Sequence, residues 1–299
     1  MPTKQKLLHF DAIDGVENYD RVFSNRQNGS GQNVTGSQSY NTRLGIATQI
    51  NNLKCISLKR VEIPFLAQNV RSTNASNYIK FYGSTYGAGV EFGGEIMLQD
   101  RNYTSITTLL ADLNTAFAAK ISTFTGVSGL SITFYVNPQD TSKIVIKSNV
   151  LQSGGGFNIG NLKFEGSILT RNILGMAFQS HANPDFMMGN ADTYSYMYLT
   201  NCYNLQPDNY FNLNFTNIET SPTNANGSPT TFKIPMSGSF GEVIYYSESD
   251  GSEQKAFIDR PNTSLTYLNM VITDRWGFPV YGFGSQISFT LNIEYDDIM

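Results

Sequence analysis

Hydrophobic and polar residues alternate most strictly near the end of the chain. In residues 286–295, apolar side chains occupy every second position from Ile287 to Tyr295, and polar side chains fill the positions between. A period of two over ten residues predicts a strand with one face in a core and the other in solvent. Residues 265–273 are also strand-like but apolar on both faces, which is typical of a strand covered on two sides.

Turn residues separate these two predicted strands. The segment between them includes Asp274, Arg275, Trp276, Gly277 and Pro279, followed by further glycines. Such residues are typical of a long hairpin loop. We therefore predict that the chain ends in a large β-hairpin whose packed loop gives these five residues a structural role.

Most of the remaining chain has the same strand-like texture. Further strands are predicted in residues 53–63, 78–82, 194–200, 210–218, 231–235, 242–246 and 256–258. Short strands separated by turn-rich stretches are typical of an all-β sandwich or barrel. With the last two strands the framework has eight or nine, and eight strands in two packed sheets form a jelly roll. The predicted fold class is all-β: a single eight-stranded jelly roll (a β-sandwich) with a small inserted α+β domain.

The inserted domain is predicted from a change of period. Apolar residues from Ile106 to Phe117 recur at helical spacing after the capping residues Thr104 and Ser105. A β-hairpin is expected in residues 130–147. A short helix in residues 167–174 should follow, with Gly175 just past its end.

These elements predict four regions. Residues 1–50 are polar and weakly periodic, and they form an N-terminal arm or loop region in which residues 26–33 should be mobile. The first part of the jelly roll is predicted in residues 51–99 and the inserted α+β domain in residues 100–184. The second part of the jelly roll is predicted in residues 185–299.

Composition narrows the range of partners. The formal net charge is −4 and only 15% of residues are charged, so no basic surface for nucleic acid is expected. Cys55 and Cys202 are too few for a disulfide framework, and Cys55 should be a buried free thiol. No run of eighteen apolar residues occurs, so no transmembrane segment is expected.

The sequence contains few residues that could support catalysis or bind a metal ion. His9 and His181 are the two histidines of the chain, and they supply neither a zinc set nor a recognisable catalytic triad. The terminal carboxylates Asp296 and Asp297 are interpreted as an exposed acidic tail. The sequence therefore predicts no cofactor, no metal and no enzymatic activity.

Aromatic residues leave one alternative open. Tyr194, Tyr196 and Tyr198 share one face of a predicted strand and could stack on sugar rings. Packing in a core or an interface explains this stripe at least as well. The alternative function is a receptor-binding or carbohydrate-binding β-sandwich module.

Three groups of residues carry a family resemblance. The first is the apolar strand that leads into Thr273-Asp274-Arg275-Trp276-Gly277-Phe278-Pro279 and the alternating final strand. The second is Val61-Glu62-Ile63-Pro64-Phe65, followed by Asn69-Val70 and residues 78–81. The third is the helix in residues 105–119, the turn in residues 137–140 and the segment 173–178. Together, over about residues 50–299, they resemble the penton (vertex) capsid protein of virophages and polinton-like viruses, of the Mavirus type.

The resemblance implies a structural role in a virion. A protein of this family would be a minor capsid protein that forms homopentamers at the fivefold vertices of an icosahedral capsid. It would contact a double jelly-roll major capsid protein, and its inserted domain would project outward. In the alternative, the receptor-binding or carbohydrate-binding β-sandwich module would belong to a virion spike. The expected location is the virion, assembled in the infected host cell, in its cytoplasm.

Overall fold

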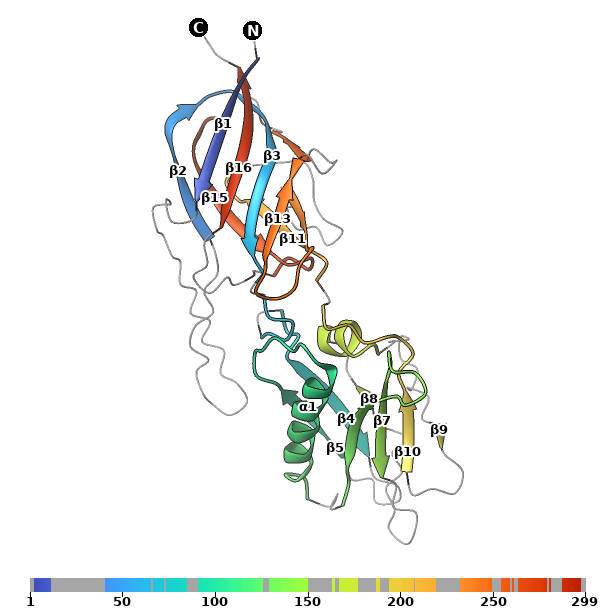
Figure 1. Cartoon of the computed structure of the whole chain (residues 1–299). Coiled ribbons are helices and arrows are strands. Elements are labelled where there is room, and N and C mark those ends of the chain that lie inside the picture. The colour runs from blue at the N-terminus through green and yellow to red at the C-terminus, as the bar shows by residue number, and fades with distance from the viewer. Residues whose placement is uncertain are drawn as a thin grey trace. The chain divides into compact units, whose positions relative to one another are not determined.

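The computed structural model divides the chain into two compact units (Figure 1). Residues Met1–Ala67 and Asp208–Met299 form the first, here called the jelly-roll unit, and residues Gln68–Pro207 form the second, called the insert. The structure describes residues 3–11, 41–65, 67–72, 74–84, 91–125, 129–149, 163–164, 167–176, 187–188, 194–206, 208–218, 232–248, 254–258, 260, 263–278, 280 and 287–296.

The jelly-roll unit consists of a five-stranded and a four-stranded sheet, both antiparallel. The five-stranded sheet has the order β1-β16-β3-β13, with β14 also paired to β3, and Figure 1 shows its first four strands side by side. Its strands are β1 (Thr3–Asp11), β16 (Ser288–Asp296), β3 (Leu53–Pro64), β13 (Val243–Ser247) and β14 (Gln254–Phe257). The four-stranded sheet has the order β12-β11-β15-β2, with β12 (Phe232–Pro235), β11 (Tyr210–Phe215), β15 (Leu265–Thr273) and β2 (Asn41–Ile50).

The strand order is that of a jelly roll. β13 pairs with residues 60–64 of β3 and β14 with residues 55–58, so the two occupy one strand position in succession. Each sheet then has four positions, and its neighbours come from distant parts of the sequence. Eight positions in two sheets with this order make a jelly roll, which confirms the predicted fold class.

Aromatic residues join the two sheets. Phe289 of β16 lies 5.9 Å, centroid to centroid, from Phe215 of β11 in the other sheet, and 5.1 Å from Phe10 of β1. Phe289 is fully buried, and burying a side chain of this kind stabilises a fold by about 2–3 kcal/mol. The strictly alternating apolar residues of the last strand therefore face the core, as predicted.

The predicted terminal hairpin is wrong. β16 pairs with β1 on one edge and with β3 on the other, whereas β15 pairs with β11 and β2. Both edges of both strands are occupied, so the segment between them crosses from one sheet to the other. A period of two tells which face of a strand is buried, but it does not tell which strand lies beside it.

The predicted arm in residues 1–50 is also wrong in part, because it contains β1 and β2. β1 pairs with β16 over its whole length, from Thr3 opposite Asp296 to Asp11 opposite Ser288. Its polar composition fits an edge position, where one face and one edge meet solvent. Residues 26–33, predicted to be a mobile loop, lie outside the described residues.

The insert is an α+β unit with two small antiparallel sheets. One has the order β5-β4-β8 and the other the order β6-β7-β10-β9. The elements are β4 (Tyr78–Ser84), β5 (Glu91–Met97), α1 (Ile106–Ile121), β6 (Ile132–Val136), β7 (Ile144–Asn149), β8 (Lys163–Phe164), the π-helix η2 (Leu169–Ile173), β9 (Met187–Met188) and β10 (Tyr194–Tyr198).

Helix α1 confirms the predicted helix and packs against both sheets of the insert. Its apolar stripe is buried, and the ring of Phe117 lies 5.1 Å from that of Phe81 in β4 and 5.0 Å from that of Phe134 in β6. Ser105 is the residue before the helix, but its side chain makes no capping hydrogen bond. The predicted hairpin of residues 130–147 is confirmed by the pairing of β6 with β7.

The boundaries of the insert differ from the predicted ones. The two units meet at residues 67/68 and 207/208, so β4, β5 and β10 belong to the insert. From their sequence, strands 78–82 and 194–200 are predicted to belong to the jelly roll. Their hydrogen-bonded partners are β5, β8, β7 and β9, all within the insert.

Candidate functional site

Asp274 organises the loop that follows β15. Its side chain is fully buried, and its Oδ1 accepts hydrogen bonds from the backbone N–H groups of Trp276 and Phe278, both at 2.9 Å. The Asp274 backbone N–H donates to the Phe278 carbonyl at 2.8 Å, and the Asp274 carbonyl accepts from Asn212 Nδ2 at 2.9 Å. A buried carboxylate with two backbone donors fixes the loop in one conformation.

The other predicted residues of this loop surround Asp274. The guanidinium carbon of Arg275 lies 4.2 Å from the centroid of the Trp276 ring, the geometry of a cation–π contact. Gly277 takes a left-handed conformation, with φ 88°. Pro279 lies outside the described residues. The loop thus connects two sheets rather than two hairpin strands, and its structural role stays a prediction.

The outer face of the five-stranded sheet presents large apolar side chains to solvent. Leu7 of β1, Val243 and Tyr245 of β13 and Phe257 of β14 are 67%, 60%, 50% and 64% exposed. We call these four residues the apolar outer face.

The alternation of the strands shows that these side chains point away from the core. Ile244, between Val243 and Tyr245, and Ala256, before Phe257, are buried in the jelly-roll core. Val243, Tyr245 and Phe257 lie along one side of β3, and Leu7 lies on the opposite edge strand of the same sheet. Large apolar side chains that gather on one face make that face a candidate interaction surface. The apolar outer face is therefore the strongest candidate for a functional site in the jelly-roll unit.

Charged residues on the same sheet are held in ion pairs. Arg60 pairs with Glu62 on β3, and its guanidinium carbon lies 5.1 Å from the centroid of the Tyr245 ring. The hydrogen bond and the negative charge of Glu62 raise the pKa of Arg60. Lys54 Nζ lies 2.8 Å from Asp296 Oδ1. Apolar anchors beside satisfied charges are the arrangement found at protein–protein interfaces.

Sequence reasoning missed the apolar outer face, although one signal was present. Residues 243–246 are apolar on both faces of a strand. That pattern usually indicates burial on two sides, yet Val243 and Tyr245 are exposed on one side of this strand. Leu7 could not be recognised because its strand was interpreted as an arm.

The residues weighed for chemistry lie apart from one another. His9 Nδ1 lies 2.9 Å from Thr290 Oγ1 on the edge of the five-stranded sheet, and His181 lies outside the described residues. Cys55 is buried and Cys202 exposed, and neither forms a disulfide. Within the described residues, no group of three or more His, Cys, Asp or Glu side chains is placed to hold a metal ion. The absence of enzymatic activity stays a prediction.

None of the helices in the described part of the chain is both long enough and apolar enough to cross a membrane.

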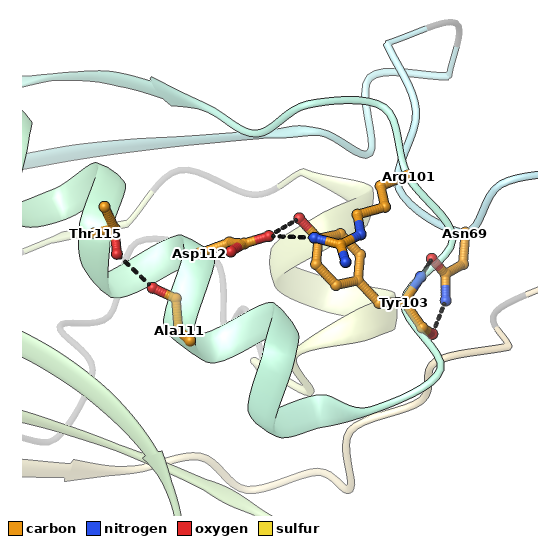
Figure 2. A network of polar contacts seen from close by, with 6 residues as sticks. All are labelled: Asn69, Arg101, Tyr103, Ala111, Asp112 and Thr115. Atoms are coloured by element: carbon orange, nitrogen blue, oxygen red, sulfur yellow. Dashed lines mark hydrogen bonds and ion pairs between the residues drawn. The ribbon is translucent and has the colours of Figure 1, made fainter.

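A buried polar network closes the base of the insert, where the chain enters and leaves it (Figure 2). Asn69 accepts a hydrogen bond from the Tyr103 backbone N–H at 2.9 Å and donates to the Tyr103 carbonyl at 2.8 Å. Its Nδ2 also donates to the Leu205 carbonyl at 2.6 Å. One buried side chain therefore ties the first residues of the insert to its last.

Tyr103 extends this network to α1. Its hydroxyl donates to Asp112 Oδ2 at 2.9 Å, and Arg101 Nη1 lies 3.2 Å from the same oxygen (Figure 2). Burial of the Tyr103 phenol, with a smaller effect from Asp112, raises its pKa far above the ordinary value. The phenol stays protonated and donates throughout the physiological range, so the network is a structural clamp.

The fold and these surfaces define a class: a jelly-roll β-sandwich with an inserted α+β unit and a sheet face on which the described residues include large exposed apolar side chains. No family model matches the sequence, and no curated protein matches it. Among solved structures, the chain is similar to the mavirus penton protein, with a TM-score of 0.44 and 9% sequence identity. The likeness covers 98% of this chain and 100% of the mavirus chain. A likeness of this degree does not assign the chain to a family.

Proposed function

We propose that this protein is a structural capsid protein that forms homopentameric pentons at the fivefold vertices of an icosahedral virion. The observation that carries the proposal is the apolar outer face on a jelly-roll sheet. The motifs of the sequence that resemble penton proteins support the same role. In this proposal the protein is not an enzyme, and its location is the virion, assembled in the cytoplasm of the infected cell.

A ring of identical subunits gives the apolar outer face a partner. In a closed ring each subunit contacts its neighbour through two different patches, and the same contact repeats until the rotation closes. Leu7, Val243, Tyr245 and Phe257 would form one of these patches. Large aromatic and aliphatic anchors dominate the energy of such contacts when the neighbour buries them.

The remaining partners follow from the same role. A vertex protein contacts the major capsid protein around it, here proposed to be a double jelly-roll protein. The net charge of −4 argues against a role in binding the genome, because nucleic-acid contacts depend on basic surfaces. The hydrogen bonds of Asn69 hold the two ends of the insert together. The insert is therefore a separate unit, and its surface can serve a separate role.

Native mass spectrometry of the purified protein, with negative-stain images of the same sample, tests the proposal. We expect a five-subunit mass and fivefold rings. Phe257→Asp should convert the rings to monomers while the circular dichroism spectrum and thermal transition are retained, because a charge would be buried in each contact. Tyr82→Asp, on a tyrosine of the insert that is 54% exposed, is the control and should leave the rings intact.

Two results would reject the assembly surface. One is a pentamer that survives Phe257→Asp and Tyr245→Asp together. The other is a protein that is monomeric both alone and when mixed with the major capsid protein, which would remove the penton role itself.

A further inference from the structure

Three tyrosines gather on one face of the β6-β7-β10 sheet of the insert. The register places Tyr135 of β6 and Tyr198 of β10 on either side of Val145 in β7. One step along the strands, Lys147 of β7 lies opposite Tyr196 of β10. We call these five residues the tyrosine face. Tyr194, the third tyrosine predicted on this strand face, has its side chain outside the described part of the chain.

The tyrosine face is turned away from the core of the insert. The residues that alternate with it, Phe134, Ile146 and Met197, are buried in the cluster that contains the apolar stripe of α1. Tyr198 is 52% exposed, and Tyr135 and Tyr196 are half-buried. The tyrosine side chains therefore offer ring surface and hydroxyl groups to solvent, whereas Val145 between them is fully buried.

The phenol groups of this face are close enough to influence one another. Burial raises the pKa of Tyr135, and the neighbouring phenols of Tyr198 and Tyr196 raise it further. These rings come from strands that are two positions apart in the sheet. Strands are spaced by about 4.8 Å, so Tyr135 and Tyr198 stand about 10 Å apart at their Cα atoms, with Val145 between them.

Lys147 gives the tyrosine face a positive charge. Its Nζ lies 5.9 Å from the centroid of the Tyr196 ring. The register also places Thr133 on this face. Of the five residues that define the tyrosine face, Lys147 is the charged one. The chain as a whole carries a net charge of −4. A local cation on an acidic protein selects for a negative group at that point.

The chemistry of the tyrosine face matches that of a sugar ring. A pyranose has an apolar C–H face and a rim of hydroxyl groups, and a tyrosine combines an apolar ring with a hydroxyl. The apolar outer face of the jelly-roll unit differs, because Leu7, Val243 and Phe257 have no polar atoms in their side chains. A protein partner is therefore favoured at the apolar outer face and a sugar at the tyrosine face.

We propose that the tyrosine face of the insert binds a glycan through a carboxylate-bearing sugar ring. The ring stacks on the exposed ring of Tyr198, beside Tyr135, and its carboxylate accepts from Lys147 Nζ. The hydroxyl groups of Tyr196 and Tyr198 exchange hydrogen bonds with the sugar hydroxyls. The inference is separate from the capsid proposal, since it needs the insert and not the ring.

Saturation-transfer NMR and titration calorimetry on the full chain test the inference with three probes. The probes are sialyllactose, a glucuronic-acid oligosaccharide and neutral lactose. We expect at least one of the two acidic probes to bind at least about tenfold more tightly than lactose. The neutral probe lacks the carboxylate and should gain only from stacking.

Variants locate the site. Tyr198→Ala should weaken binding of the acidic probe at least about tenfold, and Tyr198→Phe should weaken it less because the ring remains. Lys147→Gln should remove the preference for the acidic probe while weak lactose binding persists. Tyr82→Ala is the matched control, because Tyr82 is an equally exposed tyrosine on the other sheet of the insert.

Several outcomes overturn the inference. Failure of both acidic probes to bind the folded protein removes it, as does binding that Tyr198→Ala and Lys147→Gln leave unchanged. Equal affinity for lactose and the acidic probes removes the role of the carboxylate. Capture of a protein partner that competes with the probes and depends on Tyr198 would assign the face to that partner instead. Probe binding by a protein that never forms rings would still support the glycan site and would reject only the capsid proposal.

Discussion

Both units of this protein consist of antiparallel strands around buried phenylalanines. They differ in how far apart in the sequence the neighbouring strands lie. In the jelly-roll unit, neighbouring strands come from opposite ends of the chain, so that Thr3 lies opposite Asp296. In the insert, every strand and helix comes from one continuous segment of the chain. The jelly-roll unit therefore depends on both halves of the chain, whereas the insert depends only on itself.

Their surfaces differ in the same way. The jelly-roll unit exposes side chains without polar atoms, such as Leu7 and Phe257, on one sheet face. The insert exposes tyrosines beside Lys147. The first surface suits burial against another protein subunit, and the second suits a ligand that is itself both apolar and polar. The difference suggests that assembly and ligand recognition are divided between the two units.

The largest expected difference is between two deletions of the insert, one with the boundaries of the structure and one with the boundaries predicted from sequence. We expect that replacing residues 68–207 by a short glycine-serine linker leaves the jelly-roll unit folded and able to form rings. The rings of Phe65 and Phe211, which flank the two cut points, are already 5.9 Å apart, centroid to centroid. Circular dichroism, a cooperative thermal transition and native mass spectrometry measure the result.

The matched control is a deletion with the boundaries predicted from sequence. Replacing residues 100–184 would leave β4, β5 and β10 without α1 and β7, and buried residues such as Ile79 and Phe81 would be exposed. This variant should aggregate or show an unfolded remnant by hydrogen exchange. A well-folded product from the second deletion and an unfolded one from the first would reverse the assignment of these strands.

The next largest effect is expected from a substitution at Gly175, which lies in the insert. Its φ is +81°, and an added Cβ would meet the carbonyl oxygens of Asn201 and Cys202 at 2.5 and 2.8 Å. Both contacts are to backbone, which cannot rotate away. Gly175→Ala should destabilise the insert by about 3 kcal/mol, from left-handed strain and overpacking together.

The control for this variant lies in the jelly-roll unit. Gly241 has a similar φ of +92° but open space around its Cα, so Gly241→Ala should cost only about 1–2 kcal/mol. Hydrogen exchange followed by mass spectrometry reports each unit separately. Equal losses for the two variants would mean that the close approach to Asn201 contributes nothing.

The base clamp gives a smaller effect. Asn69→Ala leaves the N–H and carbonyl of Tyr103 and the carbonyl of Leu205 without this partner, and we expect a loss of about 2 kcal/mol. Asn114 binds both backbone groups of Phe134 in the same way, at 2.7 and 2.9 Å, but at a half-buried sheet edge. Asn114→Ala should cost about 1 kcal/mol because water can replace it.

Chemical denaturation of the two variants, with hydrogen exchange at residues 69–72 and 205–206, makes the measurement. Loss of protection at both ends of the insert is expected for Asn69→Ala and not for Asn114→Ala. If both ends keep their protection in the Asn69 variant, Asn69 does not hold the two ends of the insert together.

The sequence predicted what is local and failed where partners are distant. Helix α1, the β6–β7 hairpin and the alternating core face of β16 follow from spacing within a few residues. The pairing of β16 with β1 and β3 depends on residues almost the whole chain away, and no period records it. The polar edge strand β1 could not be predicted for the same reason, because its strand conformation depends on pairing with the distant strand β16.

Carboxamide side chains show a similar limit. Asparagine-rich stretches predict loops and turns, yet several carboxamides bind the backbone of ordered segments. Gln254 of β14 accepts from the Lys233 N–H at 2.7 Å and donates to its carbonyl at 2.6 Å, which joins the edges of the two sheets. Asn69 and Asn114 do the same within the insert. Composition reveals that such residues are abundant, and only the fold reveals which backbone groups they meet.

The smallest expected effect concerns pH and compares one carboxylate in each unit. The hydrogen bond from Lys54 is the main cause that lowers the pKa of Asp296, where the two ends of the chain meet, and the hydrogen bond from Ser142 is the main cause for Asp140 in the insert. A lowered pKa in the folded state means that each carboxylate stabilises its unit above about pH 4. This stabilisation is lost as the pH falls through the lowered pKa.

NMR titration of the two carboxyl groups between about pH 2 and 6 measures this effect directly. Lys54→Gln should return the Asp296 midpoint toward the ordinary aspartate value and leave that of Asp140 unchanged, because the two lie in different units. The side chains of Asp296 and Asp140 are 21% and 40% exposed and form ion pairs at the surface, so the change in thermal stability should be small. A shift of both midpoints in the Lys54 variant would show that the two units are coupled, and would contradict the expectation that they are independent.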